Sequence, residues 1–127
     1  MLHFAALSIV SESVAQPLRY WDNNVGGALS LLRAMDEAGV HRLIFSSTCS
    51  TYGEPEQMPI REDTPQRPIN TYGETKLAIE RLILDHGRAR PDFRYGVLRY
   101  FNVAGCGASG RLGEDHRPET HLLPIIL

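Results

Sequence analysis

The chain has 127 residues and a formal net charge of −2, with 43% hydrophobic and 22% charged residues. These values are ordinary for a soluble globular protein and allow one modest domain. No basic stripe points to nucleic acid, and no apolar run is long enough to cross a membrane. The start lacks a secretion signal, and two isolated cysteines, Cys49 and Cys106, favour a reducing cytoplasm over a disulfide scaffold.

The first third of the chain predicts strand, loop, helix and strand. Residues 1–6 are apolar and predict a buried strand, and the polar residues 8–16 predict a loop. Apolar residues then recur at helical spacing over 18–38, after a proline that suits a first turn, and Gly39 predicts the helix end. The predicted inward face comprises Val25, Ala28, Leu29, Leu32 and Met35. Residues 43–47 predict a second buried strand.

The remaining residues predict one more helix and one more strand. Four prolines exclude regular structure over 53–68. A helix is expected from Thr71 to about Arg88, because Thr71 and Glu74 form a Thr-x-x-Glu capping box. Residues 93–101 predict a third strand, and the glycine- and proline-rich chain after Asn102 predicts an irregular segment.

Apolar strands that alternate with helices predict an α/β fold with a parallel sheet covered on both faces. The pattern corresponds to part of a Rossmann-like, doubly wound sheet with three strands and two helices, followed by an irregular C-terminal segment. Ligands of such sheets gather beyond the carboxyl ends of the strands. Three clusters are expected there, at residues 5–8, 46–48 and 100–102. A binding site is therefore predicted at this edge.

Tyr72 and Lys76 are four residues apart on the predicted helix and so share one face. A free phenol has a pKa of about 10, and a neighbouring cation lowers it. The pair suits a tyrosine base, although an exposed tyrosine beside a solvated lysine has the same pattern. Ser46, Ser47 and Thr48 follow the second strand and place hydroxyls at the same sheet edge, where ordinary turn chemistry is the alternative.

Two further patterns carry little functional weight. Residues 105–110, "GCGASG", match the dinucleotide-binding pattern G-x-G-x-x-G. Such a loop must be followed at once by a helix, and Gly113 and Pro118 argue against a helix here. A flexible loop near a ligand is therefore expected. His116 and His121 fit no standard zinc spacing, so no metal is predicted.

The ordered motifs of the chain resemble the extended short-chain dehydrogenases/reductases of the NAD-dependent epimerase/dehydratase family, and among them the UDP-glucose 4-epimerases. Tyr-x-x-x-Lys alone is a weak signal, whereas six motifs in order are specific. They are "HFAA" (3–6), "ESVAQPLRYWDNNV" (12–25), "FSSTCSTYGEP" (45–55), "PINTYGETKLAIE" (68–80), "LRYFNVAGC" (98–106) and "PETHLLP" (118–124).

The resemblance implies roles for individual residues. Tyr72 would be the catalytic acid/base on the sugar 4-hydroxyl, Lys76 would bind the nicotinamide ribose and lower the pKa of Tyr72, and Thr48 would hydrogen-bond the 4-hydroxyl. Further NAD contacts would come from Phe4, Ala5, Ala6, Leu7, Asn23, Tyr100 and Phe101. The UDP-sugar would also contact Asn102, His121 and Leu122. Ser8 stands where some epimerases carry lysine.

The implied reaction interconverts UDP-glucose and UDP-galactose by hydride transfer from C4 to NAD and its return to the other face. Dehydratases of the family carry an acidic pair after the threonine, and decarboxylases a glutamate, where this chain has Cys49 and Ser50. The epimerase is thus favoured, while a non-catalytic NAD-binding module and an inactive fragment remain alternatives.

The resemblance also implies that parts of the family's domain lie outside this sequence. The glycine-rich first βαβ unit and most of the substrate domain have no counterpart in it. Residues 1–127 would form one partial NAD-binding domain, with 102–127 the start of the substrate-binding region. A cytoplasmic enzyme that is a homodimer when full length is expected.

Overall fold

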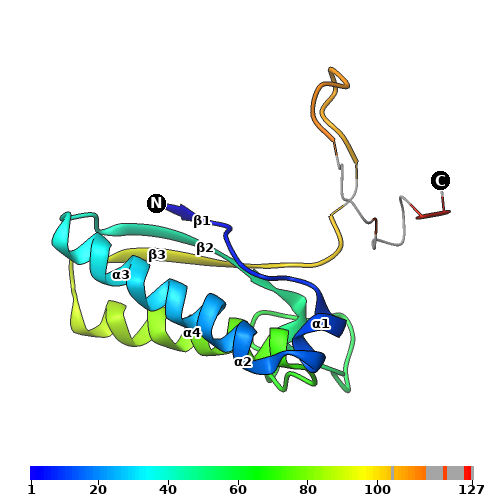
Figure 1. Ribbon diagram of the computed structural model, residues 1–127, viewed down its shortest axis with the longest axis horizontal. Coiled ribbons are helices and arrows are strands. Elements are labelled where there is room, and N and C mark those ends of the chain that lie inside the picture. Colours follow the sequence, from blue (N-terminus) through cyan, green and yellow to red (C-terminus); the bar gives the residue numbers. More distant parts are fainter. Residues whose placement is uncertain (104, 114–118, 120–124, 127) are drawn as a thin grey trace.

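A three-stranded parallel sheet organises the chain in the computed structural model, which describes residues 1–103, 105–113, 119 and 125–126 (Figure 1). The strands are β1 (Leu2–His3), β2 (Arg42–Thr48) and β3 (Arg94–Tyr100), in the order β1-β2-β3. Phe45 of β2 is in register with His3 on one side and Val97 on the other. The predicted partial Rossmann-like sheet is confirmed.

The two predicted helices are present, and a third precedes them. The first predicted helix is built from α2 (Pro17–Tyr20), a π-helix (Trp21–Gly26) and α3 (Gly27–Glu37). The second is α4 (Thr71–Ala89), and a short 3₁₀ turn, Cys49–Thr51, follows β2. The additional helix, α1 (Val10–Ala15), lies in the segment expected to be a loop. A six-residue helix is too short to hold by itself, and contacts with other elements, described below, stabilise it.

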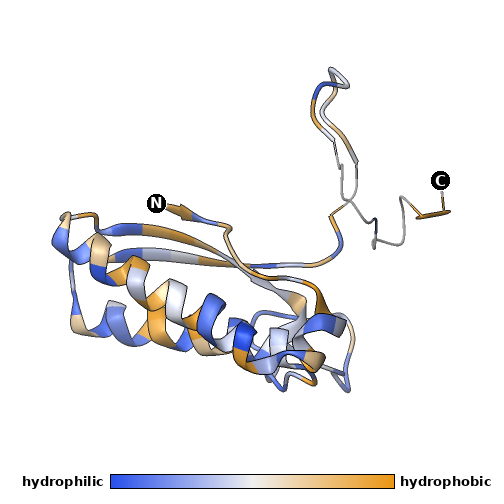
Figure 2. Ribbon diagram, in the orientation of Figure 1, coloured by the Kyte–Doolittle hydropathy of each residue, from blue (hydrophilic) through white to orange (hydrophobic). Residues whose placement is uncertain are grey.

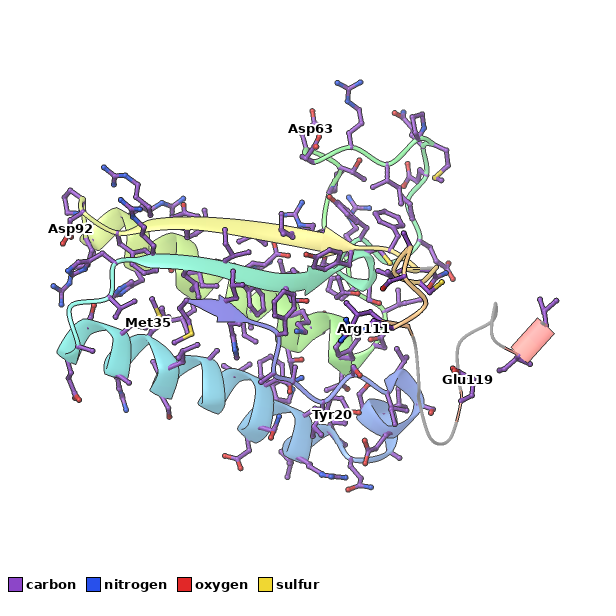
Figure 3. All side chains as sticks on the ribbon, turned by 90° about the horizontal axis from the view of Figure 1, so that it is seen from above. Tyr20, Met35, Asp63, Asp92, Arg111 and Glu119 are labelled. Atoms are coloured by element: carbon purple, nitrogen blue, oxygen red, sulfur yellow. The ribbon has the colours of Figure 1, made fainter. Side chains whose placement is uncertain are left out.

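Both long helices lie on one face of the sheet (Figure 1). Right-handed crossovers that run in one direction, from β1 to β2 to β3, place both helices on the same side. In the view from above, the strands β2 and β3 lie in front of α4 (Figure 3). Leu98 is 44% and Leu2 63% exposed. Helices were expected on both faces of the sheet, but within the described residues they cover only one face.

The core fills the space between this covered face and the helices. The middle of β2 is apolar, whereas α3 and α4 mix apolar with polar residues (Figure 2). The core residues are Ala28, Leu32, Met35, Leu43, Phe45, Ile79, Ile83 and Phe93. Leu29, predicted to face inward, is 37% exposed instead. No helix in the described part of the chain is both long and apolar enough to span a bilayer.

Three local predictions have clear outcomes. Gly39 does end α3: it has a φ of +65°, and Val40 N–H donates to the Met35 carbonyl in a Schellman motif. The predicted capping box is wrong by one residue, because Asn70 is the N-cap of α4 and its side chain accepts from Gly73 N–H. The first strand is also shorter than predicted and is not buried, since it lies at the sheet edge.

Candidate active site

The first turn of α4 is packed tightly against the end of β2. Gly73 N–H donates to Asn70 Oδ1 at 2.8 Å, and Tyr72 N–H donates to Ser13 Oγ of α1 at 3.1 Å. A Cβ on Gly73 would lie 2.6 Å from the Ser50 carbonyl oxygen, so glycine permits this approach. The arrangement brings Tyr72 to the turn that follows Thr48, as the sequence predicts.

Lys76 is buried one turn further along α4, with 3% of its surface exposed. Its Nζ donates to the Ser46 carbonyl at 2.9 Å and lies 4.9 Å from the centre of the Phe45 ring and 5.8 Å from that of Tyr72. Burial lowers the pKa of Lys76 to about 8. A fraction of the amine is therefore neutral near physiological pH.

The pKa of Tyr72 departs from the expected direction. Burial raises it, a hydrogen bond with Thr48 opposes that rise, and the neighbouring Cys49 adds to it. Lys76, whose ammonium donates to the Ser46 carbonyl, is not among the groups that shift this pKa. The expected lowering of the Tyr72 pKa by Lys76 is thus wrong for this chain. A further positive charge is needed to make the phenol a base near neutral pH.

The end of β1 reaches the same place from the sheet edge. The His3 ring stacks on Phe45 with centroids 5.7 Å apart. Burial lowers the pKa of His3, and repulsion from Lys76 lowers it further. The His3 ring, which these effects keep neutral, thus stacks on the Phe45 ring that lies under the ammonium of Lys76.

The segment after β1, residues 4–7, is held by a residue that the sequence analysis did not single out. Asn24 is buried, and its side chain accepts from Leu7 N–H at 2.9 Å and donates to the Leu7 carbonyl at 3.0 Å. It also donates to Thr75 Oγ1 of α4 at 3.2 Å. The predicted contact Asn23 is exposed and donates to Asn24 Oδ1. Asn24 thus links the expected cofactor segment to the helix of Tyr72.

The backbone of residues 4–7 continues from β1 at the carboxyl edge of the sheet. Phe4 is 61% exposed, Ala5 is exposed, and Ala6 and Leu7 are half-buried. Ser8 is exposed as well. The segment therefore presents several side chains and backbone groups to solvent beside the Tyr72–Lys76 pair.

The predicted residues at the end of β3 and just after it are exposed at the same edge of the sheet. Tyr100, Phe101 and Asn102 are all exposed, while His121 and Leu122 lie outside the described residues. Residues 107–112, which overlap the "GCGASG" motif, form a turn in which Gly107 N–H donates to the Leu112 carbonyl. No helix begins within the described residues 105–113. This agrees with the loop expected there.

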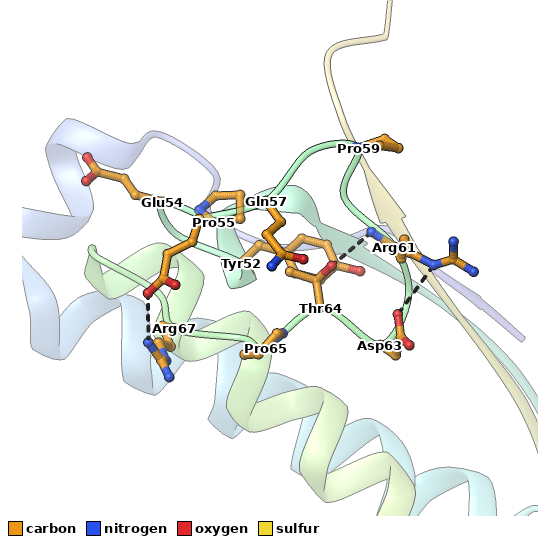
Figure 4. Close-up of a pocket in the computed structure, with 11 residues that line it drawn as sticks. Tyr52, Glu54, Pro55, Gln57, Pro59, Arg61, Asp63, Thr64, Pro65 and Arg67 are labelled. Carbon is orange, nitrogen blue, oxygen red and sulfur yellow. Dashed lines mark hydrogen bonds and ion pairs between the residues drawn. The ribbon is translucent and has the colours of Figure 1, made fainter.

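Two hollows lie beside the site rather than in it. One, of about 440 Å³, is enclosed by the proline-rich loop 53–68 and lined by Tyr52, Arg61, Thr64 and Arg67 among others (Figure 4). Another, of about 520 Å³, lies between this loop and the end of β3 and includes Tyr100 and Phe101. Neither is lined by Thr48, Tyr72 or Lys76. Within the described residues, the catalytic residues expected from sequence therefore lie outside both of these hollows.

Sequence reasoning missed several buried polar residues near the pair, among them Ser13, Asn24 and Glu80. Glu80 carried a usable signal, because it follows Lys76 by one turn on the same helical face. Ser13 carried none, since its helix α1 forms only in the tertiary context. Asn24 and Asn23 are adjacent asparagines, and only the phase of the π-helix decides which of the two is buried.

Comparison with known proteins agrees with this fold. The model of the NAD dependent epimerase/dehydratase family matches residues 1–127. The UDP-glucose 4-epimerase of Lactobacillus helveticus is 55% identical over 127 residues, which are 100% of this chain and 38% of that protein.

Solved structures give the same result. The UDP-glucose 4-epimerase from Brucella ovis in complex with NAD is 50% identical, with a TM-score of 0.93 over 98% of this chain and 38% of that one. The Bifidobacterium longum enzyme in complex with NAD+ and UDP is 45% identical, with a TM-score of 0.85 over 90% of this chain and 34% of that one. The chain thus spans well under half of the relatives it matches, and it belongs to the NAD dependent epimerase/dehydratase family.

Proposed function

We propose that this chain provides the catalytic segment of a UDP-glucose 4-epimerase, which interconverts UDP-glucose and UDP-galactose. The observation that carries the proposal is the placement of Tyr72, Lys76 and Thr48. All three lie at the carboxyl edge of the parallel sheet, where α/β enzymes bind their ligands. The isolated chain itself is expected to be inactive, because it spans about two-fifths of its relatives.

The residues present fit the nicotinamide side of NAD. The ammonium of Lys76 would bind the nicotinamide ribose, and Asn24 fixes the backbone of Leu7, which would also contact the cofactor. Bound NAD would supply the hydride acceptor and donor for sugar C4. The residues that would hold it are Phe4, Ala5, Ala6, Leu7, Asn23, Lys76, Tyr100 and Phe101.

Tyr72 would take the proton of the sugar 4-hydroxyl and later return it. Since burial keeps its phenol protonated near neutral pH, the positive nicotinamide ring would supply the charge that Lys76 alone does not. Thr48, which already interacts with Tyr72, would orient the 4-hydroxyl. Asn102, His121 and Leu122 would contact the UDP-sugar, in a substrate-binding region that begins at residue 102.

A dehydratase or decarboxylase is the second candidate within the family. Such enzymes need a carboxylate beside the threonine, whereas Cys49 and Ser50 occupy the 3₁₀ turn after β2. A non-catalytic NAD-binding module is the alternative outside catalysis. Retention of both Tyr72 and Lys76, with the lysine buried, favours an enzyme.

A chimaera tests the proposal directly. Residues 1–127 replace the matching 127 residues of the Lactobacillus helveticus enzyme, and conversion of UDP-galactose to UDP-glucose is measured. The chimaera is expected to turn over, and its Tyr72→Phe variant to be at least about 100-fold slower. An active parent enzyme with a folded, NAD-containing but inactive chimaera would refute the assignment.

We further propose a cytoplasmic homodimer for the full-length protein. Both cysteines are free, which suits a reducing compartment. Leu18 of α2, Trp21 of the π-helix and Leu29 of α3 are exposed apolar residues that suit a helix–helix contact. Light scattering of the chimaera and its Leu18→Glu variant tests this, since loss of a dimer is expected only in the variant.

A further inference from the structure

A second charged group is buried on α4, one turn beyond Lys76. Glu80 is 1% exposed, and its carboxylate accepts hydrogen bonds from three different elements. Gln66 Nε2 of the proline-rich loop donates at 3.0 Å, Arg99 Nη2 of β3 donates at 2.8 Å, and Ser47 Oγ of β2 also donates. Burial alone would raise the pKa of Glu80, but these hydrogen bonds outweigh it and lower the pKa. The buried group is therefore a carboxylate.

Two neighbouring residues of β2 are bonded to two residues of α4 that are one turn apart. The Ser46 carbonyl accepts from Lys76 Nζ, and the next residue, Ser47, donates to Glu80. Two such bonds fix both the sliding and the rotation of a helix on a strand. Thr48 is the next residue of the strand, and Tyr72 lies one turn earlier on the helix. The alignment of Thr48 with Tyr72 is therefore set by the two neighbouring bonds, Lys76 to the Ser46 carbonyl and Ser47 to Glu80.

Arg99 extends this network to the loop that joins β2 to α4. It pairs with Ser47 in the β2–β3 register and contacts Glu80 through both Nε and Nη2. Its Nη1 donates to Tyr52 Oη at 2.7 Å and to the Glu62 carbonyl at 3.0 Å. Together with the direct bond from Gln66, Arg99 thus links three points of the connection between Thr48 and α4 to the same carboxylate.

We propose that Glu80 is a positioning residue that holds α4 in register with β2, so that Tyr72 lies opposite Thr48. This rests on the proposed function but concerns a residue that touches neither substrate nor cofactor. Removing the hydrogen bonds of Glu80 loosens the packing of α4 on β2, which buries Lys76. The pKa of Lys76, which depends on that burial, thus reports on the register of α4 with β2.

Lys76 is the only lysine of the 127-residue chain. A ¹³C-lysine label in this chain therefore gives one NMR signal, and titration of that signal yields the pKa of Lys76. Ser47→Ala removes only the bond between β2 and Glu80, and Glu80→Gln removes the charge with little change of shape. In both variants the pKa of Lys76 is expected to rise from about 8 towards its ordinary value of 10.5. Asp85→Asn breaks an exposed arginine pair of the same helix and should leave it at about 8.

Turnover gives an independent readout in the chimaera. Ser47→Ala should lower kcat by about 10-fold or more with KM within about 3-fold, since misplacement affects the transition state more than binding. Asp85→Asn should leave both constants unchanged. The proposal is overturned if Ser47→Ala keeps both the Lys76 pKa and kcat. An inactive unaltered chimaera would instead count against the proposed function, and the Lys76 titration would still decide the role of Glu80.

Discussion

Replacement of Lys76 by methionine should stabilise the fold while removing a catalytic group. The pKa of Lys76 falls from 10.5 to about 8 because its ammonium is buried. A change of one pKa unit corresponds to about 1.36 kcal/mol, so keeping this lysine charged in the folded chain costs about 3 kcal/mol. The lost hydrogen bond from the charged amine to the Ser46 carbonyl offsets about 1.5 kcal/mol. Lys76→Met is therefore expected to be about 1.5 kcal/mol more stable at pH 7.

The pH dependence has a defined sign. Between about pH 8 and 10.5 the unfolded chain keeps the lysine proton that the folded chain has lost, so the stability of the wild-type chain rises with pH. The variant lacks this rise, and its advantage should be full below pH 8 and gone by pH 10.5. Urea unfolding of both chains, followed by circular dichroism, measures the difference. A variant that is no more stable at pH 7, or a difference that does not change with pH, would refute the reasoning.

Three further predictions concern the site. Gly73→Ala should destabilise the chain by about 1–3 kcal/mol, because the added methyl group meets the Ser50 carbonyl. Gly27→Ala is the control, because a methyl group there meets nothing within 4 Å and should not destabilise the chain. Thermal unfolding of the two variants measures the difference. Mass spectrometry of products from the chimaera should show a hexose without loss of water, and a dehydrated sugar would identify a dehydratase. Calorimetry with the isolated chain should detect no micromolar NAD binding, because no glycine-rich turn opens onto a helix within the described residues; a clear micromolar constant would contradict this.

Much of the fold follows from patterns in the sequence. The alternation of apolar strands and amphipathic helices predicts the parallel order, and Tyr72 and Lys76 share a face because four residues complete about one turn. What the patterns miss depends on tertiary contacts. Two hydrogen bonds hold the helix α1. Ser13 Oγ accepts one from Tyr72 N–H, and the Tyr20 hydroxyl donates the other to the Ile9 carbonyl. Neither bond has a local sequence signal.

The electrostatics of the site were the least predictable part. Proximity on a helix suggests that Lys76 lowers the pKa of Tyr72, yet burial dominates the pKa of each residue. The depth of a side chain and the direction of its hydrogen bonds depend on how α4 is seated on β2. Spacing along the sequence contains neither quantity.

The π-helical stretch Trp21–Gly26 has a consequence for how this segment tolerates change in length. Its wider i→i+5 turns accommodate an extra residue between α2 and α3, and the buried positions Tyr20, Asn24 and Ala28 line up across it. Deleting one residue here would therefore restore a regular α-helix and keep Tyr20 on the face of Ala28, because seven residues complete about two α-helical turns. Deleting a second residue would instead rotate everything before it by about 100° relative to α3. Tyr20 would then turn to solvent, and the packing that holds Asn24 against the Leu7 backbone would be lost. The π-helical stretch is thus the part of this helix that best absorbs the loss of one residue, provided that Asn24 itself is kept.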